Sequence, residues 1–165
     1  MTSLSQALTA KAEQVLDRCA ATATVLAVAE SCTGGLVSAS LTAIAGSSAW
    51  FDRAFVTYAN QAKIDLLGVS PLLIEKHGVV SEEVARAMAE GALSHSTADA
   101  TAGITGIAGP AGGSADKPVG LVHIAAARRG RDTRHRTLHL AGDRDAIRTA
   151  AALAAMDLLI EQMED

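Results

Sequence analysis

The stretch TVLAVAESCTGG, residues 24–35, decides the fold of this chain of 165 residues. Its first half is a short, continuous apolar run, which is typical of a strand covered on both faces. Its second half contains a serine, a cysteine, a threonine and two glycines, and apolar residues at helical spacing follow it as far as Ile44. We therefore predict a strand, a tight turn and a helix.

The same alternation of strands and helices continues on both sides of this stretch. The predicted elements are, in order, a helix over 4–19, strands over 24–29 and 54–58, a short helix that Gly68 stops, a helix from Ser81 to about Ser94, a strand over 101–104, a hairpin of 119–127 with 133–140, and a final helix that Asp143 caps. This order predicts a single domain over 1–165 of the α/β class, a three-layer α/β/α sandwich on a mixed, mainly parallel sheet.

Composition narrows the classes of function. Hydrophobic residues make up 49% of the chain and the net charge is −4, which argues against a disordered chain and against broad capture of nucleic acid or of an anionic membrane. Two cysteines without a C-x-x-C pair indicate a reducing compartment, and the five histidines lack ligand spacing, so no metal is expected. No signal peptide or membrane span is visible. We expect a soluble, cytoplasmic protein.

An arginine-rich run covers residues 128–136 of the predicted hairpin. It could meet nucleic acid, but no aromatic residue lies near it for base stacking. A solvated hairpin face therefore explains it better.

Ser31 directly follows the first buried strand and precedes a helix, a position that suits a nucleophile or an anion site as well as a helix N-cap. A serine hydroxyl needs a base, and no histidine is placed by the sequence to serve. The candidate bases are Lys63, in the first turn of the next helix, and Tyr58, at the end of the preceding strand. By residue type alone, Lys63 would be an exposed helix lysine and Tyr58 a ring packed with other aromatic residues. Cys32 is more nucleophilic, but strand alternation points its side chain away from that of Ser31.

The loop over residues 105–113 is too rich in glycine to be a helix or a strand. Thr105 and the loop's backbone amides are the parts of an oxyanion hole or a phosphate cradle, although the dinucleotide and P-loop motifs are not matched. If the strands are parallel, the loops at Ser31, after Tyr58 and at Thr105 meet at one edge of the sheet, where ligands bind in such folds.

Five motifs occur in a specific order along the chain. They are ESCTGG at 30–35, YANQAK at 58–63, HGVVS at 77–81, ITGIAGP at 104–110 with KPVG at 117–120, and GDR at 142–144. Together they resemble the CinA C-terminal domain family, the nicotinamide-nucleotide amidohydrolases, some of which carry competence or damage-inducible names. The resemblance implies hydrolysis of nicotinamide mononucleotide to nicotinate mononucleotide and ammonia, a pyridine-nucleotide salvage step, with no metal and no cofactor.

By matching position, the resemblance implies that Ser31 is the nucleophile, that Lys63 and Tyr58 activate it, and that Thr105 is a further active-site hydroxyl. Either the turn at Thr33 and Gly34 or the glycine loop over 105–113 could hold the oxyanion, and the other could hold the phosphate. The aromatic residues within 50–58 could offer a face to the pyridinium. The expected substrate-binding residues are Thr33, Gly34, Gly35, Ser48, Asn60, Gly106, Gly109 and Arg144.

Two departures from the family pattern keep other functions open. The family commonly has a small hydroxyl residue and a glutamate where this chain has Ala59 and Gln61. The alternatives are a non-catalytic nucleotide-binding regulatory module and an amidase for another small amide. In each case we expect a small-molecule partner, no nucleic acid and no membrane, and we expect this alanine-rich chain to form a homo-oligomer.

Overall fold

The computed structural model describes residues 4–164. Its elements are α1 (Gln6–Thr22), β1 (Leu26–Glu30), α2 (Leu36–Thr42), the 3-10 helix η1 (Ser47–Ala49), β2 (Phe51–Val56), α3 (Asn60–Leu67), α4 (Pro71–His77), α5 (Glu82–Ser94), β3 (Ala100–Gly106), β4 (Leu121–Arg128), β5 (Arg131–His139) and α6 (Arg144–Met163).

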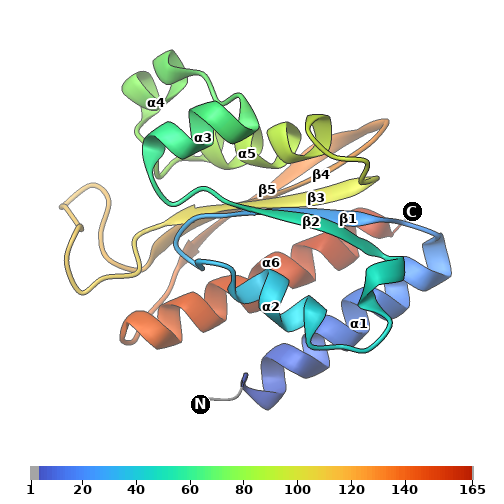
Figure 1. Ribbon diagram of the computed structural model, residues 1–165. Coiled ribbons are helices and arrows are strands. Elements are labelled where there is room, and N and C mark those ends of the chain that lie inside the picture. Colours follow the sequence, from blue (N-terminus) through green and yellow to red (C-terminus); the bar gives the residue numbers. More distant parts are fainter. Residues whose placement is uncertain (1–3, 165) are drawn as a thin grey trace.

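The strands form one mixed sheet in the order β2-β1-β3-β4-β5, with helices on both faces. Figure 1 shows α1, α2 and α6 on one face and α3, α4 and α5 on the other. β1 pairs in parallel with β2 and β3, whereas the β3–β4 and β4–β5 pairings are antiparallel. Four strands therefore run in one direction and β4 runs against them. The predicted three-layer α/β/α sandwich is confirmed.

The core is built on the central strands, whose backbone approaches the helices closely. The apolar residues of β1 are fully buried, as its continuous apolar run predicts. On β3, a Cβ added to Gly103 would lie 2.5 Å from the carbonyl oxygen of Ala85 and 2.6 Å from the amide nitrogen of Ala89. α5 thus packs directly on the backbone of β3, which brings its first turn to the carboxyl end of the sheet.

Three predicted helix boundaries are confirmed by their caps. Ser81 Oγ accepts a hydrogen bond from Val84 N at the start of α5, and Asp143 Oδ1 accepts one from Ala146 N at the start of α6. Gly68 ends α3 in the left-handed conformation, with φ of 67°.

The structure differs from the prediction around the second strand. β2 ends at Val56, so the predicted strand over 54–58 was shifted and Tyr58 lies beyond it. Trp50 and Phe51 pack against the core cluster of α1 and α6, whereas Phe55 packs against the cluster of α3 and α5. The aromatic residues are therefore split between the two sides of the sheet and form no common face.

α4 was not predicted, because none of its residues is buried and it leaves no apolar periodicity in the sequence.

None of the helices within residues 4–164 has the length and apolar character that crossing a membrane requires.

The arginine-rich run holds the β4–β5 hairpin to its neighbours. The Arg129 guanidinium donates to three carbonyls at the end of α5 and in the segment after it, and Arg128 donates to Gln162 O in α6. Arg136 pairs with Glu161. Several of these side chains therefore brace the hairpin, rather than forming the freely solvated face that the sequence suggested.

Candidate active site

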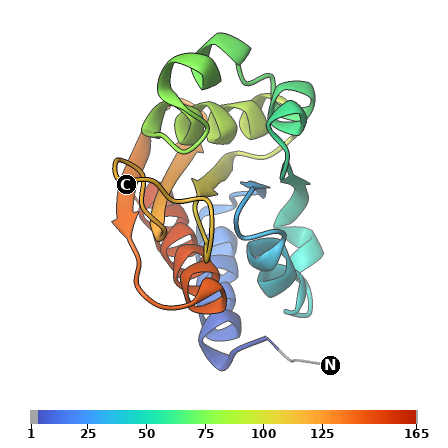
Figure 2. The same cartoon turned by 90° about the vertical axis from the view of Figure 1, so that its left-hand side faces the viewer.

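A cleft of about 450 Å³ opens at the edge of the sheet where the parallel strands end. Figure 2 views the molecule toward this edge, where the loop over 107–120 projects. The turn after β1, the start of α3, the segment before α5, the glycine loop and the first residue of α6 all contribute to the wall. The three loops that were expected to converge do so. The wall includes Ser31, Cys32, Tyr58, Asn60, Lys63, Thr105, Gly106, Gly109, Lys117 and Arg144.

Ser31 and Lys63 come together at this cleft. Lys63 Nζ lies 3.0 Å from Ser31 Oγ, although 32 residues separate them in sequence. Both residues are buried, since Ser31 is 8% exposed and Lys63 is 1% exposed. Lys63 is therefore not the exposed helix lysine that its residue type would suggest.

Burial makes the neutral form of Lys63 easier to reach than it is for an exposed lysine. Desolvation lowers the pKa of its amine, and the charge of Cys32 acts in the opposite direction. Nζ donates to Thr57 O at 2.7 Å and to Tyr58 O at 3.4 Å, so its third neighbour is the Ser31 hydroxyl. A neutral amine has two N–H groups and one lone pair, and this set of two carbonyls and one hydroxyl satisfies all three. An amine in this state can accept the proton of the serine.

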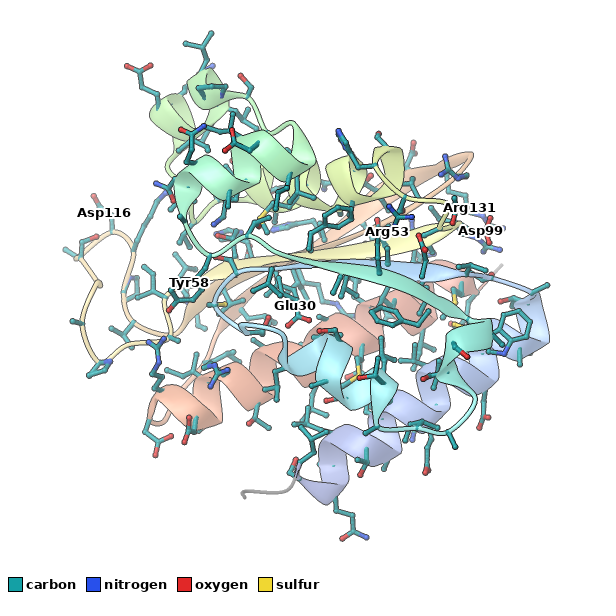
Figure 3. All side chains as sticks on the ribbon, viewed as in Figure 1. Glu30, Arg53, Tyr58, Asp99, Asp116 and Arg131 are labelled. Atoms are coloured by element: carbon teal, nitrogen blue, oxygen red, sulfur yellow. The ribbon has the colours of Figure 1, made fainter. Side chains whose placement is uncertain are left out.

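Tyr58 lies at the mouth of the cleft and is 60% exposed. Its hydroxyl accepts a hydrogen bond from Arg144 Nη2 at 2.8 Å, and Arg144 Nη1 donates to Gly109 O at 2.7 Å. Figure 3 shows Tyr58 at the same end of the molecule as the glycine loop. The group in contact with Ser31 is thus the Lys63 amine, while the phenol is held at the rim.

Thr105 and Lys117 join the glycine loop to the segment before α5. Thr105 is 1% exposed, and its hydroxyl donates to Val79 O at 2.8 Å. Lys117 Nζ donates to His77 O at 2.6 Å and to Val80 O at 2.8 Å. No role for Lys117 follows from the sequence beyond its place in the KPVG motif at 117–120.

The turn after β1 is already occupied by a carboxylate from the chain itself. Glu30 is fully buried, and its carboxylate accepts hydrogen bonds from the amides of Gly35, Val37 and Ser38 at 3.0, 3.1 and 2.8 Å. The Gly34 amide donates to Ser31 O. Gly34 and Gly35, which were expected to contact the substrate, use their amides within the turn and do not line the cleft.

Two further expected contacts are not found at the cleft. Thr33 is fully buried and its hydroxyl does not reach the cleft wall. Ser48 lies in η1, just before β2 begins, whereas the cleft forms where the strands end. Ser48 was selected by residue type alone, and the direction of β2 places it at the opposite edge of the sheet.

The charge of the cleft contrasts with that of the chain. Lys117 and Arg144 line it in addition to the Lys63 amine, and no aspartate or glutamate among the described residues does so, although the whole chain carries a net charge of −4. Such a concentration of cations favours an anionic ligand.

Within residues 4–164, no group of three histidine, cysteine, aspartate or glutamate side chains is arranged to hold a metal ion.

Cys32 also lines the cleft, but its thiol is a poor nucleophile there. Burial raises its pKa to about 11. The thiol is therefore protonated at neutral pH, whereas the hydroxyl beside it has a base within hydrogen-bonding distance.

Comparisons with known proteins point to one family. The model of the CinA C-terminal domain matches residues 8–163. The "Nicotinamide-nucleotide amidohydrolase PncC" of Enterobacter agglomerans is 51% identical over 136 residues, which are 81% of this chain and 82% of that protein. The protein of the same name from Escherichia coli K12 is 48% identical over 151 residues, 91% of each chain.

Longer proteins and solved structures match as well. The "CinA-like protein" of Syntrophobacter fumaroxidans is 56% identical over 85% of this chain, but the chain spans only about a third, 33%, of that protein's length. The crystal structure of the competence/damage inducible protein CihA from Agrobacterium tumefaciens superimposes with a TM-score of 0.96 and 42% identity, covering 99% of this chain and 100% of that chain. This chain belongs to the CinA C-terminal domain family.

Proposed function

We propose that this chain hydrolyses the carboxamide of nicotinamide mononucleotide to nicotinate mononucleotide and ammonia, with Ser31 as nucleophile and Lys63 as its base. The observation that carries the proposal is the 3.0 Å contact between the buried Lys63 amine and the Ser31 hydroxyl in a cationic cleft. The names of two relatives that match this chain over most of their own length support the choice of substrate.

The reaction follows from the environment of the amine. Neutral Lys63 takes the Ser31 proton while Oγ attacks the carboxamide carbon, which gives a tetrahedral intermediate and an ammonium at Nζ. The ammonium returns its proton to the departing nitrogen, so ammonia leaves and an ester remains on Ser31. Water then attacks the ester with the same amine as base, which releases the carboxylate and restores the hydroxyl.

The oxyanion is held by the turn after β1. The Ser31 amide donates to Ile104 O, so it is not available for this purpose. The amides of Cys32 and Thr33 make no hydrogen bond within the part of the chain that the structure describes. Thr33 is fully buried and does not line the cleft, whereas Cys32 does, so the Cys32 amide is the donor that the oxyanion can reach. Backbone donors so close to an attacked carbonyl are worth about 3 kcal/mol each in hydrolases.

The phosphate is held at the outer part of the cleft. Lys117 and Arg144 supply positive charge there, and Asn60 and the backbone of Gly106 and Gly109 line the same wall. The exposed ring of Tyr58 can face the pyridinium, which is the one cationic part of the substrate.

Ammonia release from nicotinamide mononucleotide tests the proposal. Ser31→Ala should lower kcat by at least about 1000-fold, because the Lys63 amine contacts no other hydroxyl among the described residues. Ser48→Ala is the matched serine control and should keep full activity, since Ser48 lies away from the cleft. Activity retained by Ser31→Ala would contradict the assignment of the nucleophile.

The pH profile separates the two candidate bases. kcat/KM should rise with pH through an ionisation below 10.5, the ordinary pKa of lysine, because burial lowers the pKa of Lys63. Lys63→Arg, which stays protonated, should be inactive across this range. A Tyr58→Phe enzyme should keep the same pH profile. Loss of this ionisation in Tyr58→Phe but not in Lys63→Arg would assign the base to the phenol.

A binding module without catalysis is the less favoured alternative. Burying a lysine costs stability, and a module that only binds nucleotide has no use for an amine directed at a serine. Nucleotide binding without ammonia release would nonetheless favour the module. Release of ammonia from other amides in a substrate panel, but not from the mononucleotide, would favour an amidase of different specificity.

We infer further that the protein works in the cytoplasm as a homo-oligomer. Cys19 and Cys32 are both free thiols, as expected in a reducing compartment. Leu66 on α3 and Leu72 on α4 are 48% and 74% exposed and offer apolar surface for contact between copies. Light scattering on the purified chain tests the second point, and a monomeric mass at micromolar concentration would contradict it.

A further inference from the structure

Arg148, in the second turn of α6, contacts the catalytic turn without lining the cleft. Its Nε donates to Cys32 O at 3.2 Å and its Nη2 to Thr33 O at 2.9 Å. Arg148 also forms an ion pair with Asp145, in which Arg148 Nη1 lies 3.8 Å from Asp145 Oδ1 and the Asp145 side chain is 89% exposed. The strongest interactions of this guanidinium are therefore with two successive carbonyls next to Ser31.

These contacts fix the direction of the neighbouring amides. In a trans peptide the C=O and N–H groups point in opposite directions. Because Arg148 holds the Cys32 carbonyl, the Thr33 N–H that shares its peptide plane points away from the guanidinium. The Thr33 carbonyl is held in the same way, and the Gly34 N–H of that plane turns back to Ser31 O at 3.0 Å.

The other side of the turn is fixed by Glu30, whose carboxylate holds the amides of Gly35, Val37 and Ser38. The Arg148 guanidinium therefore binds two carbonyls of the turn, and the Glu30 carboxylate binds three amides that follow it. Within this turn, the amides of Cys32 and Thr33 have no partner among residues 4–164, and of the two residues Cys32 lines the cleft with Ser31.

We propose that Arg148 is a positioning residue that holds the carbonyl side of the turn after Ser31, so that the Cys32 N–H stays available to the oxyanion at the cleft. The inference rests on the proposed serine mechanism. A planar guanidinium reaches both carbonyls at once from fixed N–H groups, whereas a lysine offers a single point of charge. Holding both carbonyls therefore requires the planar shape of the guanidinium as well as its positive charge.

The test compares Arg148→Met and Arg148→Lys with the parent, and uses Asp145→Asn as the matched control because it removes the exposed ion pair and leaves the turn contacts intact. kcat and KM for ammonia release from nicotinamide mononucleotide are measured with the thermal midpoint of each variant. We expect kcat to fall about 100-fold in Arg148→Met and at least about 10-fold in Arg148→Lys, with KM within about threefold of the parent. Asp145→Asn should stay within about twofold.

A second readout separates this inference from the choice of substrate. p-Nitrophenyl acetate transfers its acetyl group to Ser31 Oγ and releases p-nitrophenolate, and the modified chain is seen by mass. Both Arg148 variants should acetylate more slowly by the same factors as kcat falls. If the parent acetylates but releases no ammonia from the mononucleotide, the proposed substrate fails while the role of Arg148 is still measured.

Three results would overturn the inference. The first is a kcat within about threefold of the parent in both Arg148 variants. The second is a change in KM that equals the change in kcat. The third is a failure of both variants to fold, which would make the arginine a structural residue only. A parent that neither releases ammonia nor acetylates would overturn the inference together with the proposed function.

Discussion

Replacing Glu30 by glutamine tests whether the carboxylate next to Ser31 in sequence holds the turn after β1 in place. Glu30 is fully buried, forms no ion pair among the described residues, and bonds only to backbone amides. Figure 3 shows it between the sheet and α2. It therefore caps the N-terminus of α2 from the end of β1, where the helix dipole favours a negative charge.

The expected loss follows from the geometry of its two oxygens. Oε2 accepts from Gly35 and Val37, and Oε1 accepts from Ser38. A glutamine can keep its carbonyl at the first position, but its NH₂ group then faces the Ser38 N–H, donor against donor. One charge-assisted bond worth about 2 kcal/mol disappears, an amide is left unsatisfied, and the remaining bonds weaken, so we expect a loss of about 3 kcal/mol.

Urea denaturation measures the free energy of unfolding directly. Glu13→Gln, at an exposed position of α1, is the matched control and should change stability by less than about 0.5 kcal/mol. The argument is refuted if Glu30→Gln is as stable as Glu13→Gln, because three hydrogen bonds to a buried carboxylate would then contribute nothing.

Other perturbations probe different parts of the fold. Gly103→Ala should cost about 3 kcal/mol, read from the urea midpoint, because its methyl group would overlap the backbone of α5; a stability equal to the parent would mean that α5 moves freely. Burial, together with their mutual proximity at 2.9 Å, lowers the pKa of His123, and burial lowers that of His135, from the usual 6.5. The folded state therefore binds protons less readily than the unfolded state, so stability should be full above about pH 6.5 and should fall as pH drops through the lower folded values, and the fall should flatten in His123→Gln. A stability that stays constant from pH 5 to 7 would contradict this. Alkylation of Cys32 by iodoacetamide should keep accelerating toward pH 11, its raised pKa, and a rate that levels off near pH 8 would show a reactive thiolate instead.

The sequence predicts best those elements whose signals are local. The apolar run over 24–29 and the caps at Gly68, Ser81 and Asp143 identify strand and helix ends because each signal acts within a few residues. α4 has no buried residue, and β2 is an edge strand that is partly exposed, so neither presents a clear periodic pattern.

The site shows a similar division. Residue types and motifs bring Ser31 and Lys63 to attention, but only the folded chain gives the distance between them. The contacts of Glu30 and Arg148 cannot be predicted from the sequence because their partners are backbone amides and carbonyls, which no pattern of side chains reveals. Ser48 is the opposite case, since its residue type suits the expected contact but it lies in η1, before β2 begins, and does not line the cleft.

The neighbours of the Lys63 amine make its proton easy to move. Two carbonyls and one hydroxyl can accept all three hydrogens of an ammonium, and the same hydroxyl can rotate to donate to the lone pair of a neutral amine. Either protonation state is therefore fully hydrogen-bonded with every heavy atom in place. In the proposed mechanism a proton can therefore leave the serine and pass to the leaving group while the scaffold stays still, so the protein would need no rearrangement between the two halves of the reaction.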